Sequence, residues 1–331
     1  MRRSKAGVAM IALMALTLAG CARELSGASV VRSSALSLLP RESIGLFVVE
    51  VGSLKKIQGF STWMEQISET AEPGGPLREI HDRLGLEAVK DLDRLGLVIV
   101  PIEEEGLGYG ILAEGQFDHE ALREALGGEE IVTFLQIDGE PDLSATVIEG
   151  GHLALGPRAV LEKIRLNASG GGEGLDLNEV LLGMLETVEA TSQVWGAVDC
   201  HAMAELARQT SSGTLLFKKG PIPDSALSDA LESLAFQGRF EGGLQFDLFG
   251  EADDAENAEL LADTLRGLIA FGRIGASQND ENEWTALLDG LEIGQEGSAI
   301  TMSGSIPEKS LVALAESISA GSPAVPGPPG Y

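Results

Sequence analysis

The chain alternates between short runs of apolar residues and stretches in which apolar residues recur at helical spacing. Residues 44–51 (IGLFVVEV) and 95–102 (LGLVIVPI) are continuous apolar runs, which are typical of buried strands. Leu54, Ile57 and Phe60 follow the first run at the spacing of one helix face. Further strands are predicted over residues 110–117, 131–137, 145–148, 152–155, 194–198, 236–240, 244–249, 291–293 and 299–303.

Several helix starts are marked by their first residues. Asp118 is expected to accept hydrogen bonds from backbone N–H groups at the start of a short helix. Pro157 suits the first turn of the next helix, because proline has no N–H to leave unpaired there. In the second half, Asp253 is expected to cap a long helix that ends near Phe271, and Pro307 to open a last one. The residues expected on the buried sides are Leu122, Leu126, Val160, Leu161, Ile164, Leu311 and Leu314.

The order of these elements recurs along the chain. Leu54 and Ile57 follow the first strand at the same spacing at which Met203 and Leu206 follow a later one. Strands grouped as hairpins, with helices between them, favour antiparallel sheets over a doubly wound parallel sheet. We therefore expect an α+β fold of two similar domains, each a mainly antiparallel sheet with helices on one face. An internal duplication explains the repeated order, and convergent patterning is the alternative.

Composition shifts predict the domain boundaries. The glycine-rich residues 167–176 (NASGGGEGLD) are expected to separate a first domain over 39–170 from a second over 175–319. Residues 21–38 are small and polar with few apolar positions, so they are expected to form a tether. Residues 320–331 are rich in proline and glycine, which predicts an extended tail.

The first residues have the composition of an export signal. A basic start (MRRSK) precedes an uncharged apolar stretch that is shorter than the ~20 residues needed to span a bilayer. The sequence LAGC at residues 18–21 then resembles the lipobox of bacterial lipoproteins. The resemblance implies cleavage after Gly20, removal of residues 1–20 as a signal peptide, and a diacylglycerol thioether on Cys21 with an acylated N-terminus. A plain secretory signal that ends near a cysteine is the alternative.

The same resemblance implies a location. More than one acyl chain provides the membrane affinity that a single chain lacks. Ala22 follows the cysteine, whereas an aspartate there would resemble an inner-membrane retention signal. The expected partner is therefore a membrane, through the lipid on Cys21, and in a cell with two membranes it is the periplasmic face of the outer membrane.

Two short motifs of the body resemble a group of uncharacterised bacterial secreted proteins and lipoproteins. One is Leu39-Pro40 before the strand that begins at Ile44, and the other is GQFD at residues 115–118 before a helix. These motifs cover little of the chain. The resemblance supports the fold, and no function comes with it.

Charge excludes one class of partner. The 331 residues include 23 Lys and Arg against 51 Asp and Glu, a formal net charge of −28. Contacts to phosphates need a basic surface, so we expect no nucleic-acid partner. The chain has two cysteines, which excludes a disulfide-stapled scaffold and a four-cysteine zinc site.

The reactive residue types form no recognisable catalytic motif. Cys200 and His201 are adjacent, so in a strand their side chains point to opposite faces, and in a helix they lie ~100° apart. The glycine-rich stretches lack the Lys and Ser or Thr that end a phosphate-binding loop. The histidines occur singly, at positions 81, 119, 152 and 201, with no zinc-binding helical spacing.

Acidic and aromatic residues give weaker hypotheses. Asp91 and Asp93 begin like a calcium-binding loop, but Ile102 stands where the loop needs a glutamate. The tryptophans, at positions 63, 195 and 284, are expected in the core, and a groove for a lipid or peptide is the alternative.

We therefore expect no catalytic residue, no cofactor and no metal. The hypothesis is a non-enzymatic, lipid-anchored protein of the cell envelope that acts as a binding or scaffold module for an unidentified envelope protein or hydrophobic ligand. The alternative is a periplasmic carrier or chaperone for a lipid or a hydrophobic polypeptide.

Overall fold

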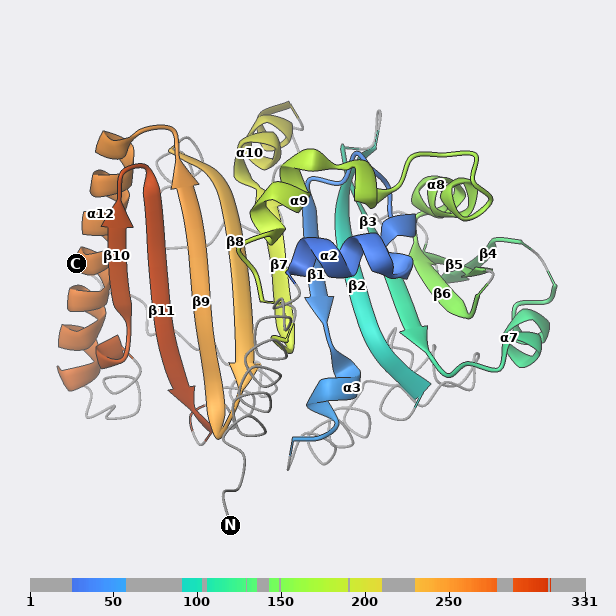
Figure 1. Cartoon of the computed structure of the whole chain (residues 1–331), viewed down its shortest axis with the longest axis horizontal. Helices are drawn as coiled ribbons and strands as arrows, with labels where there is room; N and C mark the ends of the chain where they lie inside the picture. Colours follow the sequence, from blue (N-terminus) through green and yellow to red (C-terminus); the bar gives the residue numbers. More distant parts are fainter. Residues whose placement is uncertain are drawn as a thin grey trace, which may run out of the picture.

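A single antiparallel sheet forms the centre of the molecule. The computed structural model of the chain describes residues 26–57, 91–102, 106–128, 130–135, 143–148, 150–189, 191–209, 230–278, 288–308 and 310. Eleven strands lie in the order β10-β11-β9-β8-β7-β1-β2-β3-β6-β5-β4, and each pairs antiparallel with its neighbours (Figure 1). The α+β composition and the antiparallel pairing confirm the coarse fold class expected from the sequence.

The strands fall close to the predicted apolar runs. Their bounds are β1 Gly45–Val49, β2 Leu92–Ile102, β3 Gly106–Gly115, β4 Val132–Leu135, β5 Leu143–Ile148, β6 His152–Gly156, β7 Val194–Asp199, β8 Leu231–Phe240, β9 Gly243–Ala252, β10 Glu292–Glu296 and β11 Ala299–Pro307. The helices are α2 Gly27–Ser33, α3 Val51–Leu54, α7 His119–Ala125, α8 Arg158–Ala168, α9 Glu179–Leu185, α10 Cys200–Gln209 and α12 Ala255–Gln278, with short 3-10 turns η1 Ala35–Leu38 and η2 Leu175–Leu177.

Two of the predicted helix starts are confirmed. The Asp118 carboxylate accepts hydrogen bonds from the N–H groups of Glu120 and Ala121 at the start of α7. Pro157 stands directly before α8. The inward-facing residues expected on these two helices are buried, namely Leu122, Leu126, Val160, Leu161 and Ile164.

Both ends of the long helix in the second half differ from the prediction. The side chain of Asp254, not Asp253, accepts a hydrogen bond from the N–H of Asn257, and α12 continues to Gln278. Pro307 ends strand β11 opposite Gly243, and Glu308 and Ser310 after it are helical, so a helix starts directly after Pro307 as expected; the rest of that helix lies outside the described residues. Proline is tolerated at a strand end, where its missing N–H costs no ladder hydrogen bond.

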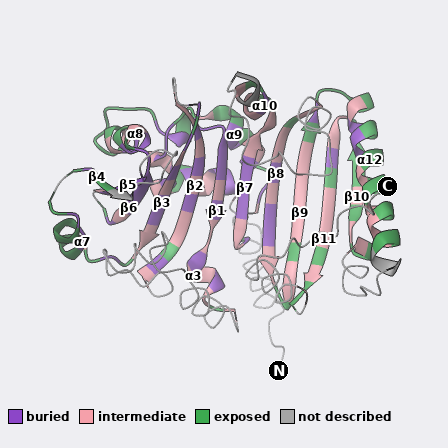
Figure 2. Cartoon of the chain, turned by 180° about the vertical axis from the view of Figure 1, so that it is seen from behind, coloured by how far each residue is buried: buried purple, intermediate pink, exposed green. Residues whose placement is uncertain are grey.

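Helices cover both faces of the sheet, so the expectation that they lie on one face is wrong. A front layer of α2, η1, η2, α8 and α9 faces the viewer in Figure 1 and packs on Leu46 and Val48 of β1. On the back, α3 and α7 share a second core with strand residues that include Leu153, and α12 packs on Ile300. Successive strand residues point to opposite faces, so the continuous apolar run of β1 needs cover on both sides. Strand β1 at the centre of the sheet and strands β5 and β6 toward the β4 edge are mostly buried, whereas β9, β10 and β11 are mostly half-buried or exposed (Figure 2).

The expectation of a tether over residues 21–38 is wrong for the part that the structure describes, 26–38. Helix α2 and η1 pack into the front core, where Ala28, Val31 and Leu36 are fully buried. Ser26 caps α2 by accepting a hydrogen bond from the N–H of Ser29. Few apolar positions suggested a tether, but these three are spaced to meet one surface, and the packing of that surface decides the structure.

The two halves of the chain share one sheet instead of forming two separate ones. Strand β1 pairs with β7, with Phe47 opposite Gly196, so hydrogen bonds cross the expected boundary. Residues of the expected linker are also fixed, because Gly174 bridges to Pro40 and Leu175 is buried. One core therefore extends across both halves.

Within that sheet, the halves repeat one arrangement on either side of the β1–β7 pair. The first half runs β1, α3, β2, β3, α7 and the β5–β6 hairpin, and the second runs β7, α10, β8, β9, α12 and the β10–β11 hairpin. The first half adds β4 at its edge. A register shift lies between Leu92 and Arg94 in β2, and a second lies between Leu231 and Ser233 at the corresponding place in β8.

Among the described residues, no helix is both long and apolar enough to cross a bilayer.

Candidate functional site

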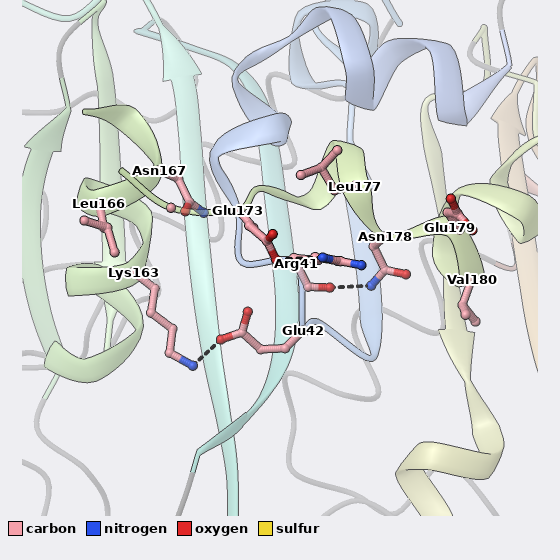
Figure 3. Close-up of a pocket in the computed structure, with 11 residues that line it drawn as sticks. Arg41, Glu42, Lys163, Leu166, Asn167, Glu173, Leu177, Asn178, Glu179 and Val180 are labelled. Carbon is pink, nitrogen blue, oxygen red and sulfur yellow. Dashed lines mark hydrogen bonds and ion pairs between the residues drawn. The ribbon is translucent and has the colours of Figure 1, made fainter. Parts of the chain in front are cut away.

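An open groove of about 740 Å³ lies on the front layer, between α8 on one side and η2 and α9 on the other (Figure 3). The turn that leads into β1 forms its floor. The lining residues are Arg41, Glu42, Lys163, Leu166, Asn167, Gly172, Glu173, Leu177, Asn178, Glu179 and Val180. The groove therefore combines residues from both halves of the chain.

Side-chain to backbone hydrogen bonds hold the groove in shape. The Asn178 amide donates to the carbonyl oxygens of Arg41 at 2.6 Å and Ser43 at 2.8 Å, and its side-chain oxygen caps α9 by accepting from Leu181. The Asn167 amide donates to the carbonyl oxygen of Leu38 at 2.9 Å. These bonds tie the glycine-rich segment to the turn before β1, which explains why the segment is part of the fold and not a loose linker.

Ion pairs border the groove. Arg41 pairs with Glu173 at 2.7 Å, and Lys163 pairs with Glu42 (Figure 3). Both pairs are about half exposed, so water screens them and each contributes little to stability. The rim therefore carries charged side chains, but within each pair the two charges cancel.

Apolar side chains complete the rim. Leu166 of α8 is 52% exposed, Leu177 of η2 is 48% exposed and Val180 of α9 is 57% exposed. Single exposed apolar side chains are ordinary, but these three line one groove. An open, partly apolar surface with charged borders is suited to contact with a partner that is itself amphipathic.

A second polar cluster lies where β1, β2, β3 and β6 approach one another. Arg94 donates hydrogen bonds to Glu50 at 2.8 Å and to Glu114 at 3.1 Å, and all three side chains are mostly buried. Burial lowers the pKa of Arg94, but the hydrogen bonds and charges of Glu50 and Glu114 outweigh it and raise that pKa. One guanidinium thus compensates two mostly buried carboxylates.

Two histidines flank this cluster. His152 lies opposite Glu114 in the β3–β6 pair, and the imidazole of His119 lies against Gly151. Burial lowers the pKa of His152, the charge of Glu114 acts in the opposite direction, and His119 lowers it further. Among the described residues, the buried Nδ1 of His152 and Oε1 of Glu114 find no hydrogen-bond partner. Along the sequence the histidines are single and scattered, and only the strand register reveals this grouping.

The other residues considered from the sequence lie apart. Cys200 is partly buried at the start of α10, and burial together with the charge of Asp199 raises the pKa of its thiol to about 11. His201 beside it is exposed. Asp93 is near Lys55, at 3.8 Å, and Trp195 is fully buried in the front core, as expected.

Several predictions fall outside the described residues. They concern Gly20, Cys21, His81, Trp63, Trp284 and the tail over residues 320–331. In the part of the chain that the structure describes, no group of three or more His, Cys, Asp or Glu residues is arranged to hold a metal ion.

The groove itself was not predicted. Its polar residues come from the turn at Arg41, from α8 and from the glycine-rich segment, and no local pattern connects them. The sequence did contain one indication of the groove. Leu166, Leu177 and Val180 are apolar, but they do not lie at the helix positions that face the core. Comparison with known proteins adds nothing to this picture: no family model, no curated protein and no solved structure matches the chain.

Proposed function

We propose that this chain is a lipid-anchored protein of the cell envelope that acts as a binding module, with the groove on the front layer as its binding surface. The lipobox-like residues 18–21 support the anchor. The observation that carries the binding role is the groove rim, where Leu166 on one side and Leu177 and Val180 on the other expose apolar surface around two ion pairs (Figure 3).

The repeated arrangement supports a duplication of one α+β unit. Ser26 bridges to Glu189 and Pro40 bridges to Gly174, so the segment before β1 and the segment before β7 lie antiparallel to each other. The repeat then begins near Ser26 in the first half and near Gly174 in the second, and the β1–β7 pair is the joint between the repeats. The groove lies next to this joint.

The anchor is tested by labelling cells with an alkyne-bearing fatty acid. We expect the wild-type chain to carry the label and to fractionate with membranes, and the Cys21→Ser variant to lose both properties. A Cys200→Ser variant is the matched control, because its thiol is partly buried and far from ionised at neutral pH. Label and membrane fractionation that persist in Cys21→Ser contradict the proposal.

The binding surface is tested with a photo-crosslinking amino acid at Val180 in the groove. Leu260 on α12 is the control position, because its side chain is also largely exposed, at 64%. We expect a defined crosslinked species from position 180 that is not formed from position 260. Identical crosslinking patterns at both positions contradict a specific role for the groove.

The same apolar rim supports a second candidate function, a carrier for a lipid or hydrophobic polypeptide. Cargo would then leave the membrane with the protein. We expect the unanchored Cys21→Ser protein to co-purify with stoichiometric lipid only if the chain is a carrier. Lipid-free protein that still crosslinks from position 180 favours the anchored binding module.

A further inference from the structure

The link between the expected lipid and the folded body is short. Four residues, 22–25, separate Cys21 from Ser26, where the described fold begins. Fully extended, the chain from Cys21 to Ser26 spans at most about 17 Å. A lipid on Cys21 therefore restricts which surface of the protein is able to meet the membrane.

The described fold begins, at Ser26, in the middle of the front layer. The Gly27 N–H donates to the carbonyl oxygen of Val188 at 2.9 Å, and a Cβ at Gly27 would lie 3.2 Å from the ring of Trp195. Ser26 is bridged to Glu189. The start of the fold is thus fixed in front of β7, near the centre of the sheet, with α2 and α9 beside it (Figure 1).

The other apolar surface of the molecule is too far away. Helix α12 packs on the back of the sheet, against β10, β11 and β9, and exposes Leu260, Phe271 and Ile274. From β7 to β10 there are four strand spacings of ~4.8 Å, about 19 Å, and α12 lies on the face of the sheet opposite to Ser26. That distance exceeds the ~17 Å reach of the link, so α12 does not lie flat on a membrane to which Cys21 is attached.

The front layer is less negatively charged than the rest of the chain, so an anionic membrane repels it less. The formal net charge of the chain is −28, which an anionic membrane repels over a Debye length of ~8 Å. Five basic residues of the front layer and its borders nevertheless each pair with a carboxylate, while Arg158 of α8 donates to the carbonyl oxygen of Ile131. The pairs are Arg32–Glu186, Arg41–Glu173, Lys163–Glu42, Arg165–Glu130 and Arg239–Glu189. Over residues 26–42 and 157–189, which form this layer, five basic and seven acidic residues leave a formal net charge of only −2.

From these observations we infer that the front layer faces the bilayer and that the groove rim of Leu166, Leu177 and Val180 contacts the interfacial region of the phospholipids. The inference rests on the proposed lipid attachment at Cys21 and names the partner of the proposed binding surface. The apolar side chains enter the boundary between headgroups and acyl chains, and the flanking cations Arg41 and Lys163 lie at the level of the lipid phosphates. The back of the sheet, with α3, α7 and α12, is then directed away from the membrane toward the periplasm.

The test uses the lipidated full-length mature protein in vesicles of phosphatidylethanolamine and phosphatidylglycerol. In a Cys200→Ser background, Val180→Cys or Phe271→Cys carries an environment-sensitive fluorophore, and a fraction of the lipids carries a headgroup nitroxide. Both positions are more than half exposed, so neither label disturbs the core. We expect quenching of about twofold or more at position 180, at an interfacial depth of ~5–10 Å, and none at position 271.

A second variant tests the geometry itself. Inserting about twenty Gly and Ser residues after Ala22 adds an average reach of about 25 Å, so quenching at position 180 should fall while the protein stays on the vesicles. Flotation of the vesicles is scored in every experiment. In the protein without the insertion, flotation without quenching at position 180, or with quenching at position 271 instead, overturns the inference and leaves the anchor intact. Protein that does not float overturns both.

Discussion

Replacing Leu36 by alanine measures how much the segment before β1 contributes to the fold. Leu36 is fully buried in the front core, and its Cδ2 methyl lies so close to Gly96 of β2 that a Cβ there would overlap it. Truncating a buried leucine to alanine costs about 2–5 kcal/mol, which includes the cavity that it leaves. Because Leu36 has no residual exposure, we expect a loss of about 3 kcal/mol.

The assay is urea unfolding of the mature chain with Cys21→Ser, followed by far-UV circular dichroism. With an m-value of about 3 kcal/mol/M for a chain of this size, the midpoint should fall by about 1 M. The matched control is Val180→Ala, whose side chain is 57% exposed, and it should change stability by less than about 0.5 kcal/mol. A midpoint for Leu36→Ala that equals the control refutes the packing of η1 on the sheet and restores the tether.

A double-mutant cycle sharpens the same prediction. Gly96→Ala alone forces a methyl group against Leu36, so we expect it to cost about 1–3 kcal/mol. In the Leu36→Ala background the same methyl group enters the vacated space. The double variant should therefore be more stable than the sum of the single changes by about 1–3 kcal/mol. Additive effects would mean that the two residues do not touch.

Three further predictions concern the polar cluster and the thiol. Burial holds the pKa of His152 below its ordinary 6.5, so the unfolded chain binds more protons than the folded chain below about pH 6.5. The free energy of unfolding should therefore fall as the pH drops below about 6.5. His152→Gln should weaken this pH dependence, as measured by urea titrations at pH 5 and pH 8. Arg94→Met should destabilise the fold by about 2–4 kcal/mol at pH 7 in urea unfolding, since its two mostly buried carboxylate partners lose their compensating charge. The Cys200 thiol, with a pKa of about 11, should react with a maleimide at pH 7 much more slowly in the folded protein than in urea.

The sequence by itself predicts much of the local structure of this protein. Apolar runs located the strands, Asp118 located a helix cap, and the spacing of Val160, Leu161 and Ile164 identified the buried side of α8. These features depend on contacts within a few residues, such as the hydrogen bond from a cap to the first turn, or on the alternation of side chains along one element. The α+β class follows from them.

The tertiary structure decided the features that depend on distant residues. Because β1 pairs with β7, the protein has one sheet where two were expected. Leu36 packs against Gly96, so the segment that was expected to be a tether is part of the core. The groove and the pairing of Glu114 with His152 arise from strand register and from loops that meet only in the folded chain. Strand pairing and packing depend on contacts between residues far apart in the sequence, because the buried area and the strand register of the whole sheet determine them. A local sequence pattern therefore does not predict them.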